Sequence, residues 1–461
     1  MSTKQGSSKA IVIGASMSGL LAASVLANYF GEVVLIERDV FPPPGVNRKG
    51  VPQGKHIHIL LELGRKIMED YLPGLTNKLV EMGAVTIADA SADVRWYKNG
   101  GYHQPGISDF AAIGVSRPTL EGAVRERVLA LPNVRAMQDT KVIELATTAD
   151  NALVMGALVL DREKNRVTVT ANLVVDASGR GSRSPAWLKE LGYKLPEEEE
   201  VQIGLGYTTC FYRRKPEDLP SLKGIVIMPT PPNKRLCALL PQDGDRWVVT
   251  IGGYLGNHAP TDYQGFLDAA RNLPTPDIYN MIKAKEPLGT PVPYKYPSNL
   301  RRRYDKLDDF PQGYLVIGDA LCSFNPIYGQ GMTVAALETA ALEECLSNGH
   351  VQLAKRFFSK ASKIIAESWN AAVGNDLNYP EVEGDRTPMT RFLNWYLGKL
   401  HTAAHRDAQV SIAFLRVINM IAPAPSILHP KIIWRVIKGN LGSSKRKPVQ
   451  VSSGSSLSGT S

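Results

Sequence analysis

The sequence predicts an α/β protein with three parts: a parallel-sheet domain, an inserted antiparallel sheet and a helical C-terminal region. Three observations support this fold class. Strand–glycine loop–helix units occur at residues 9–38 and 313–346. Between residues 195 and 294, short runs rich in β-branched and aromatic residues alternate with turn sequences. After residue 346 the apolar spacing is helical throughout.

Length and composition limit the class of protein. The 461 residues suffice for two or three domains, and 44% hydrophobic with 21% charged residues indicates a folded chain. The net charge of +9 is spread out, without a basic stripe interleaved with aromatic residues, so we predict no nucleic-acid partner. The four cysteines form no CxxC pair, which fits a reducing cytoplasm. The first apolar run is too short for a signal peptide, and no stretch is long enough to span a membrane.

Residues 9–38 begin with a predicted strand, a glycine turn, a helix at 20–30 and a second strand. Gly14, Ser16 and Gly19 follow the spacing of a dinucleotide-binding GxGxxG turn, although serine replaces the middle glycine. Glu37 closes the second strand, about where an acid that binds a ribose belongs, and Arg38 follows it. We predict that this turn binds a dinucleotide. The alternative is an α/β turn that only packs.

The segment 313–346 carries a second cluster of polar and glycine residues. Asp319 follows a short apolar strand, and its carboxylate can accept hydrogen bonds from a polyol. Gly329 and Gly331 precede a helix that begins near Met332, so its free N–H groups and its dipole can face an anionic group. These residues predict a site for a large anionic cofactor. The alternative is again a packing unit.

The string GDA followed by NPxxGQGM resembles the second FAD motif of flavin-dependent aromatic hydroxylases and epoxidases, the p-hydroxybenzoate hydroxylase-like family. The loop KGVPQGKHIH at 49–58 is similar to a subgroup that includes bacterial polyether and squalene-type epoxidases. The resemblance implies a Rossmann-type FAD-binding domain. Within it, Asp319 would bind the ribityl chain, and residues 329–332 would lie beside the isoalloxazine ring.

The same resemblance assigns further residues. It implies that Lys49, Lys55 and His56 stand near the flavin and take part in catalysis, whereas a solvated basic loop is the alternative. Arg117, at the start of a predicted helix, would contact the cofactor or else form a structural ion pair. Residues 173–183 occupy the place of the family's third motif, but Asp176 comes early, so only a role in closing around FAD is expected. His56 and His58 lack further ligands, so no metal site is predicted.

We predict domain boundaries from these elements. The FAD-binding domain comprises 1–90, 110–192 and 295–345, and the antiparallel-sheet substrate domain comprises 91–109 and 193–294. A helical region at 346–441 and a Ser/Gly-rich disordered tail at 442–461 follow. Residues 85–97 are expected to form an edge strand. The other expected sheet strands are 201–212, 224–229, 235–240 and 246–254, and the C-terminal helices are 351–373, 388–402, 405–422 and 426–440.

The resemblance implies a monooxygenase that takes electrons from NAD(P)H, directly or through a separate flavin reductase, and transfers one oxygen atom from O₂. Strands 201–212 and 246–254 present a mostly apolar surface, whose large residues are Tyr207, Phe211, Trp247, Val249 and Tyr254. Because side chains alternate along a strand, only about half of these residues can face the flavin. This surface predicts epoxidation or hydroxylation of a hydrophobic natural-product intermediate. A flavin-dependent reductase or dehydrogenase, and a non-catalytic flavin protein docked on a membrane, are the alternatives.

Two further features bear on these alternatives. A flavin-dependent halogenase is disfavoured because the chain contains no Trp-x-Trp-x-Ile-Pro string. The last two predicted helices are apolar and carry basic flanks at Arg416, Lys431, Arg435 and Lys438. Packing against the body of the protein is the first interpretation of these helices, and peripheral membrane contact is the second.

Overall fold

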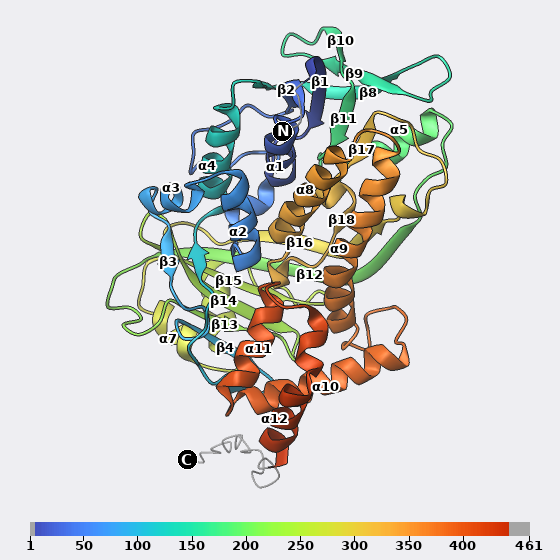
Figure 1. The fold of residues 1–461 in the computed structure, drawn as a ribbon. Coiled ribbons are helices and arrows are strands. Elements are labelled where there is room, and N and C mark those ends of the chain that lie inside the picture. Colours follow the sequence, from blue (N-terminus) through green and yellow to red (C-terminus); the bar gives the residue numbers. More distant parts are fainter. Residues whose placement is uncertain (1–4, 442–461) are drawn as a thin grey trace, which may run out of the picture.

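The computed structural model describes residues 5–441, and its two main sheets lie one above the other in Figure 1. The upper sheet has five strands in the order β17-β11-β1-β2-β7. All of its strand pairs are parallel, so the carboxyl ends of the strands share one edge. Its strands are Tyr314–Val316, Leu173–Asp176, Gln5–Ile13, Phe30–Ile36 and Val134–Met137.

Helices pack around this parallel sheet. Helix α1 (Met17–Leu26) is buried along almost its entire length, as its uniformly small and apolar sequence requires, and it packs on α4 (Arg117–Leu129) and α8 (Gly331–Ser347). The predicted helix 20–30 was wrong at its C-terminal end. Turn hydrogen bonds from Asn28 N and Tyr29 N end the helix, and Phe30 already belongs to β2.

The lower sheet has eight strands in the order β18-β16-β12-β15-β14-β13-β4-β5. Its pairs are antiparallel except for β13 with β4. The predicted fold class is therefore confirmed. The strands are Cys322–Ser323, Val292–Arg302, Glu198–Arg213, Arg246–Gly253, Arg235–Gln242, Gly224–Ile227, Val94–Lys98 and Gly101–Tyr102.

The predicted edge strand 85–97 was wrong. Asp89 accepts backbone hydrogen bonds from Ser91 and Ala92, and this turn divides the segment into β3 (Val85–Ile87) and β4. Strand β3 pairs with β6 (Ala112–Gly114), whereas β4 lies between β13 and β5 in the large sheet. The large sheet also extends beyond the predicted boundary at residue 294, because β16 continues to Arg302.

The two faces of the large sheet have different partners. Cys210, Trp247 and Val249 pack against α6 (Tyr263–Arg271) and α7 (Asp277–Ile282) on the outer face. Tyr207 and Phe211 point to the other face, towards the rest of the molecule. Of the aromatic residues named from the sequence, only those on this inner face can border a site between the two sheets.

Smaller elements complete the fold. An antiparallel sheet of three strands lies at the top of Figure 1, and several short helices join the larger elements. The three strands are β8 (Lys141–Thr147), β9 (Val154–Leu160) and β10 (Arg166–Thr170). The helices are η1 (Pro52–Lys55), α2 (Glu62–Tyr71), α3 (Leu75–Glu81), α5 (Ser184–Glu190), η2 (Tyr304–Lys306), η3 (Gly318–Ala320), η4 (Pro326–Tyr328) and η5 (Ala424–Leu428).

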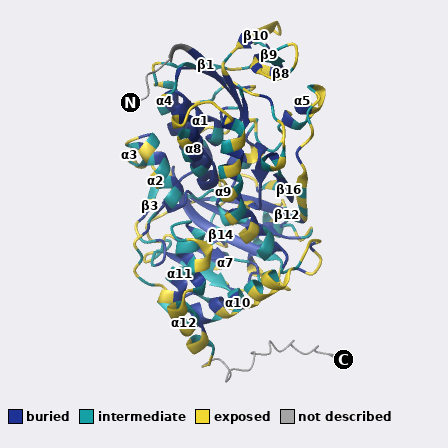
Figure 2. Ribbon diagram, turned by 45° about the vertical axis from the view of Figure 1, so that its right-hand side comes forward, coloured by how far each residue is buried: buried dark blue, intermediate teal, exposed yellow. Residues whose placement is uncertain are grey.

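The C-terminal region is helical, as predicted. It comprises α9 (Leu353–Asp376), α10 (Pro388–Ala404), α11 (Ala408–Ile418) and α12 (Pro430–Leu441). Figure 2 shows that burial is concentrated in the sheets and in α1 and α8, whereas α10 and α12 carry large exposed areas. Within residues 5–441, no helix is long and apolar enough to cross a membrane. The predicted disordered tail lies outside the described residues.

Candidate cofactor and substrate site

The glycine turn after β1 is packed tightly against the neighbouring strand. Gly14 has φ +93°, and a Cβ there would lie 2.7 Å from the carbonyl oxygen of Ala177. A Cβ on Gly19 would lie 1.9 Å from the carbonyl oxygen of Gly14. Larger residues would therefore push α1 away from the sheet. Ser16 is the N-cap residue of α1 but makes no side-chain cap hydrogen bond, so the cap leaves the first-turn N–H groups free to bind an anion.

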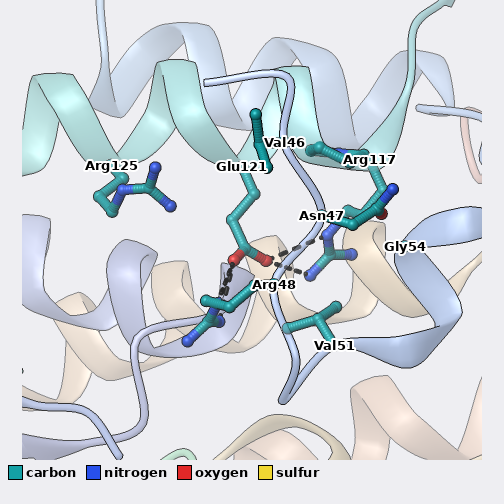
Figure 3. A pocket seen from close by; sticks show the side chains of 9 residues that line it. Val46, Asn47, Arg48, Val51, Gly54, Arg117, Glu121 and Arg125 are labelled. Atoms are coloured by element: carbon teal, nitrogen blue, oxygen red, sulfur yellow. Dashed lines mark hydrogen bonds and ion pairs between the residues drawn. The ribbon is translucent and has the colours of Figure 1, made fainter. Parts of the chain in front are cut away.

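A buried charged cluster adjoins this turn, with Glu121 between Arg48 and Arg117 (Figure 3). Arg48 Nη2 lies 2.9 Å from Glu121 Oε1, and Arg117 Nη2 lies 3.1 Å from Glu121 Oε2. Ser16 Oγ donates to Glu121 Oε2 at 2.8 Å and accepts from Arg117 Nη2 at 2.7 Å. Burial acts to raise the pKa of Glu121, but Arg117 and Arg48 outweigh it and hold that pKa below its ordinary value.

Glu37 and Arg38 directly follow β2, and Glu37 contacts this cluster through Arg48. Glu37 Oε2 accepts from Ala15 N at 2.9 Å and lies 2.5 Å from Arg48 Nη1, and Oε1 accepts from Asp39 N at 3.1 Å. These contacts fix the carboxylate at the glycine turn, where the predicted dinucleotide would pass. Arg38 is exposed. Binding of the ribose by Glu37 and Arg38 stays a prediction.

Asp319 combines two properties of a residue that lines a deep recess. Its side chain is exposed to solvent, yet desolvation by the surrounding protein raises its pKa, against the opposing effect of Arg117 and Arg180. A Cβ on Gly318 would lie 2.3 Å from Ser18 Oγ, which shows how closely this turn packs on the start of α1. Asp319 and the first turn of α1 therefore border the same space.

A buried polar network holds the loop that follows. Asn325 is fully buried, and its Nδ2 donates to Asp376 Oδ1 at 2.9 Å and to the Tyr254 hydroxyl at 2.6 Å. Tyr254 in turn donates to Asp376 Oδ1 at 2.7 Å, and Asn299 Nδ2 donates to Oδ2 at 2.8 Å. Asn299 Oδ1 accepts from Asn325 N at 2.6 Å. Asp376, at the end of α9, thus anchors the start of the glycine loop.

The rest of this loop meets the helix α8. Gly329 has φ +68°, and a Cβ there would lie 2.7 Å from Ile59 Cγ2. A Cβ on Gly331 would meet nothing within 4 Å, so this residue faces open space, whereas Met332 is buried. The loop therefore leaves its backbone accessible at Gly331, directly at the N-terminus of α8.

The basic loop divides into exposed and buried residues. Lys49 and Lys55 are exposed, whereas His56 is 2% exposed. His56 Nδ1 lies 2.9 Å from Thr209 Oγ1, and the His56 ring lies edge-on to Tyr207, with 5.0 Å between the ring centroids. Burial, with Lys55 adding to it, lowers the pKa of His56 to about 4, so the imidazole is neutral near pH 7.

An apolar surface begins at this loop and spreads over the inner face of the large sheet. Ile57 and Ile59 belong to the same cluster as Phe211, and all three are partly accessible. Further partly accessible members of this cluster lie on or next to the sheet and on α11, and they include Trp96, Met228, Ala238, Ile412 and Phe414. Because Ile59 touches the position of Gly329, this surface is continuous with the glycine loop.

The loop after β11 is held together by a buried carboxylate. Asp176 is fully buried and accepts hydrogen bonds from Ser178 N at 2.9 Å, from Ser182 Oγ at 2.5 Å and from Ser184 Oγ. Arg180, on the same loop, donates from Nη2 to Ser298 Oγ at 2.6 Å. Asp176 therefore fixes the conformation of the loop that follows it, through hydrogen bonds from the three serines. Within residues 5–441 no cluster of His, Cys, Asp or Glu suits a metal ion.

These features suit a dinucleotide with a polyol chain. They comprise an uncapped helix N-terminus beside Arg117, a second accessible backbone at Gly331 and a recessed carboxylate at Asp319. The family described as FAD binding domain matches residues 7–348, three quarters of the chain. The chain belongs to this family. FAD is therefore its cofactor, as the sequence motifs predict.

Comparisons with individual proteins agree with this membership. Protein Rv3254 of Mycobacterium tuberculosis is 30% identical over 452 residues, which is 94% of each chain. The flavin-dependent brominase Bmp2 has a similar fold, with a TM-score of 0.64 and 15% identity over 95% of this flavoprotein and 99% of Bmp2. The p-nitrophenol 4-monooxygenase PnpA of Pseudomonas putida DLL-E4 gives a TM-score of 0.62 and 15% identity over 90% and 97%.

The structure adds residues that sequence reasoning missed. Glu121 lies four residues after Arg117 on α4, a spacing that could have indicated their pairing. Arg48 opens the basic loop but was not assigned a role. No local sequence pattern marks Asp376, because its hydrogen-bond partner Asn325 lies 51 residues earlier in the chain.

Substitution of Lys55 by methionine tests the role of the basic loop. We expect the rate of flavin reduction or reoxidation to change by about threefold to tenfold, because in its predicted place beside the flavin the positive charge of Lys55 would favour anionic flavin forms. The melting temperature should stay close to that of the wild type, since Lys55 is exposed. Lys189→Met, at another exposed lysine, is the matched control. Unchanged flavin kinetics with reduced thermal stability would show that the loop is only structural.

Proposed function

We propose that this flavoprotein is a monooxygenase that inserts one oxygen atom of O₂ into a hydrophobic natural-product intermediate, by epoxidation or hydroxylation, as in the epoxidase subgroup. The observation that carries the proposal is the apolar surface from Ile59 to Phe211 and Phe414, continuous with the loop at Gly329. A lipophilic substrate bound there would lie beside the cofactor loop. The residues that form this surface are apolar, which supports a lipophilic substrate rather than a small charged acid.

FAD, when bound, would supply the activation of O₂ after reduction by NAD(P)H, directly or through a separate reductase. The overall balance is simple. One oxygen atom enters the product, the other leaves as water, and two electrons come from NAD(P)H. The four cysteines are buried and unpaired, which supports a reducing compartment such as the cytoplasm.

The chain's own residues would bind and orient the substrate and would shield the reacting centre from water. The neutral His56, fixed by Thr209, packs against the rings of Tyr207 and Tyr294 and would hold this part of the sheet in place without adding charge. The apolar residues of the sheet and of α11 would exclude water from the reacting centre. Lys49 and Lys55 would favour anionic forms of the flavin electrostatically.

The decisive experiment is turnover under ¹⁸O₂ with NAD(P)H, a flavin reductase and an alkene or electron-rich aromatic test substrate. We expect one ¹⁸O atom in each product molecule and none from H₂¹⁸O. A product formed equally well without oxygen would assign the protein to the reductases or dehydrogenases. Parallel reactions with bromide or chloride address the halogenase alternative, since a halogenated product without ¹⁸O would contradict oxygen insertion.

A further inference from the structure

Helices α10 and α12 lie at one end of the molecule (Figures 1 and 2), and both expose large apolar side chains. The six residues, which we call the end surface, are Met389, Phe392, Trp395, Trp434, Ile437 and Leu441. Trp395 is 59% exposed and Trp434 is 60% exposed. Spacings of three or four residues place each set of three on one face of its helix. Within residues 5–441, every exposed aromatic side chain belongs to this surface.

The end surface is set in strongly basic sequence. Residues 388–441 contain seven lysines and arginines and a single acid, Asp407, so this stretch contributes +6 of the net charge of +9. Asp407 is itself paired with Arg435 at 2.8 Å. Lys438 Nζ lies 5.1 Å from the ring centroid of Trp434, and a shallow hollow is lined by Pro430, Lys431, Trp434 and Arg435.

We propose that the end surface docks on an anionic lipid bilayer. Tryptophan side chains favour the interface between lipid and water, and lysines beside them attract anionic headgroups. Charge complementarity selects this occupant over a second copy of the chain, because two surfaces of the same positive charge repel each other. The helices would lie in the interface, since none of those in residues 5–441 can span the bilayer.

Helix α11 connects the docked end of the molecule with the proposed substrate site. Helix α11 packs against α10 and α12, and it contributes Ile412 and Phe414 to the apolar surface of the substrate site. A lipophilic substrate dissolved in the membrane could therefore reach the site from the docked end. This consequence rests on the proposed function, whereas docking itself does not.

Flotation of the full-length, FAD-loaded protein with vesicles tests the proposal. We expect binding to phosphatidylcholine vesicles that contain phosphatidylglycerol, and little binding to phosphatidylcholine alone. The double variants Trp395→Ser/Trp434→Ser and Lys431→Gln/Lys438→Gln should each lower the partition coefficient by at least about tenfold. Retained FAD absorbance reports that these variants are folded.

Matched controls and alternative outcomes make the test decisive. Val351→Ser/Leu195→Ser and Lys164→Gln/Lys189→Gln change exposed residues that do not belong to the end surface, and these variants should bind vesicles normally. Wild-type protein that ignores anionic vesicles would overturn the proposal. So would binding that is lost only in Lys445→Gln/Arg446→Gln/Lys447→Gln, or a wild-type dimer in light scattering that Trp395→Ser/Trp434→Ser dissociates.

Discussion

Replacing Asp319 with alanine is expected to lower the affinity for FAD by about tenfold to hundredfold. The carboxylate lies in a recess beside the first turn of α1, where a polyol chain can donate hydrogen bonds to it. A hydrogen bond to a charged acceptor is worth about 1.5–3 kcal/mol, which corresponds to this range. Titration of apoprotein with FAD, followed by flavin fluorescence, measures the change.

A stability measurement separates loss of cofactor contact from loss of fold. Desolvation disfavours the charged form of Asp319, so removal of the carboxylate should leave the melting temperature of the apoprotein unchanged or raise it. Asp308→Ala, at an exposed acid nearby in the sequence, is the matched control and should bind FAD normally. Equal FAD affinities of Asp319→Ala and the wild type would refute the assignment.

The second large effect is expected at Asp376, in a region that does not resemble a cofactor site. In Asp376→Leu, the groups that donate to this carboxylate lose a buried acceptor, namely the Tyr254 hydroxyl and the amides of Asn325 and Asn299. We expect the free energy of unfolding to fall by about 3–5 kcal/mol. Retention of FAD should fall with it, because Asn325 begins the glycine loop. Urea denaturation and the flavin content of purified protein measure the two effects.

Asp376→Asn distinguishes charge from shape. It keeps the size of the side chain, so we expect a smaller loss of about 1–3 kcal/mol. Burial raises the pKa of Asp376 to about 6, although the surrounding donors oppose it. A raised pKa stabilises the fold fully at low pH, and this contribution disappears as the pH rises through about 6. The stability advantage of the wild type over Asp376→Asn should therefore shrink between pH 4 and pH 6. A constant difference would contradict a titrating Asp376.

Much of the fold follows from short-range patterns in the sequence. The turn at Gly14 to Gly19 and the loop at Gly329 to Gly331 have local requirements for backbone freedom, so their residue types mark them. The strands of the large sheet and the C-terminal helices are visible because side-chain alternation has a fixed period in each element. These patterns predicted a site for a dinucleotide, the resemblance of the motifs to a flavoprotein family implied FAD, and family membership confirms that cofactor.

The sequence by itself thus determined the class of fold, the order of its parts and a site for a dinucleotide, since each rests on residues close together in the chain, and the family resemblance of the motifs made that dinucleotide FAD. The tertiary structure decided which side chains meet. Glu121 binds Arg48 across 73 positions of sequence, and Asp376 reaches Asn325 from a helix beyond the cofactor loop. The tertiary structure also places Tyr207 and Phe211 on the opposite face of the large sheet from Trp247, and it leaves aromatic residues of α10 and α12 exposed. The physical reason is that contacts between distant segments depend on the path of the whole chain, which no local period records.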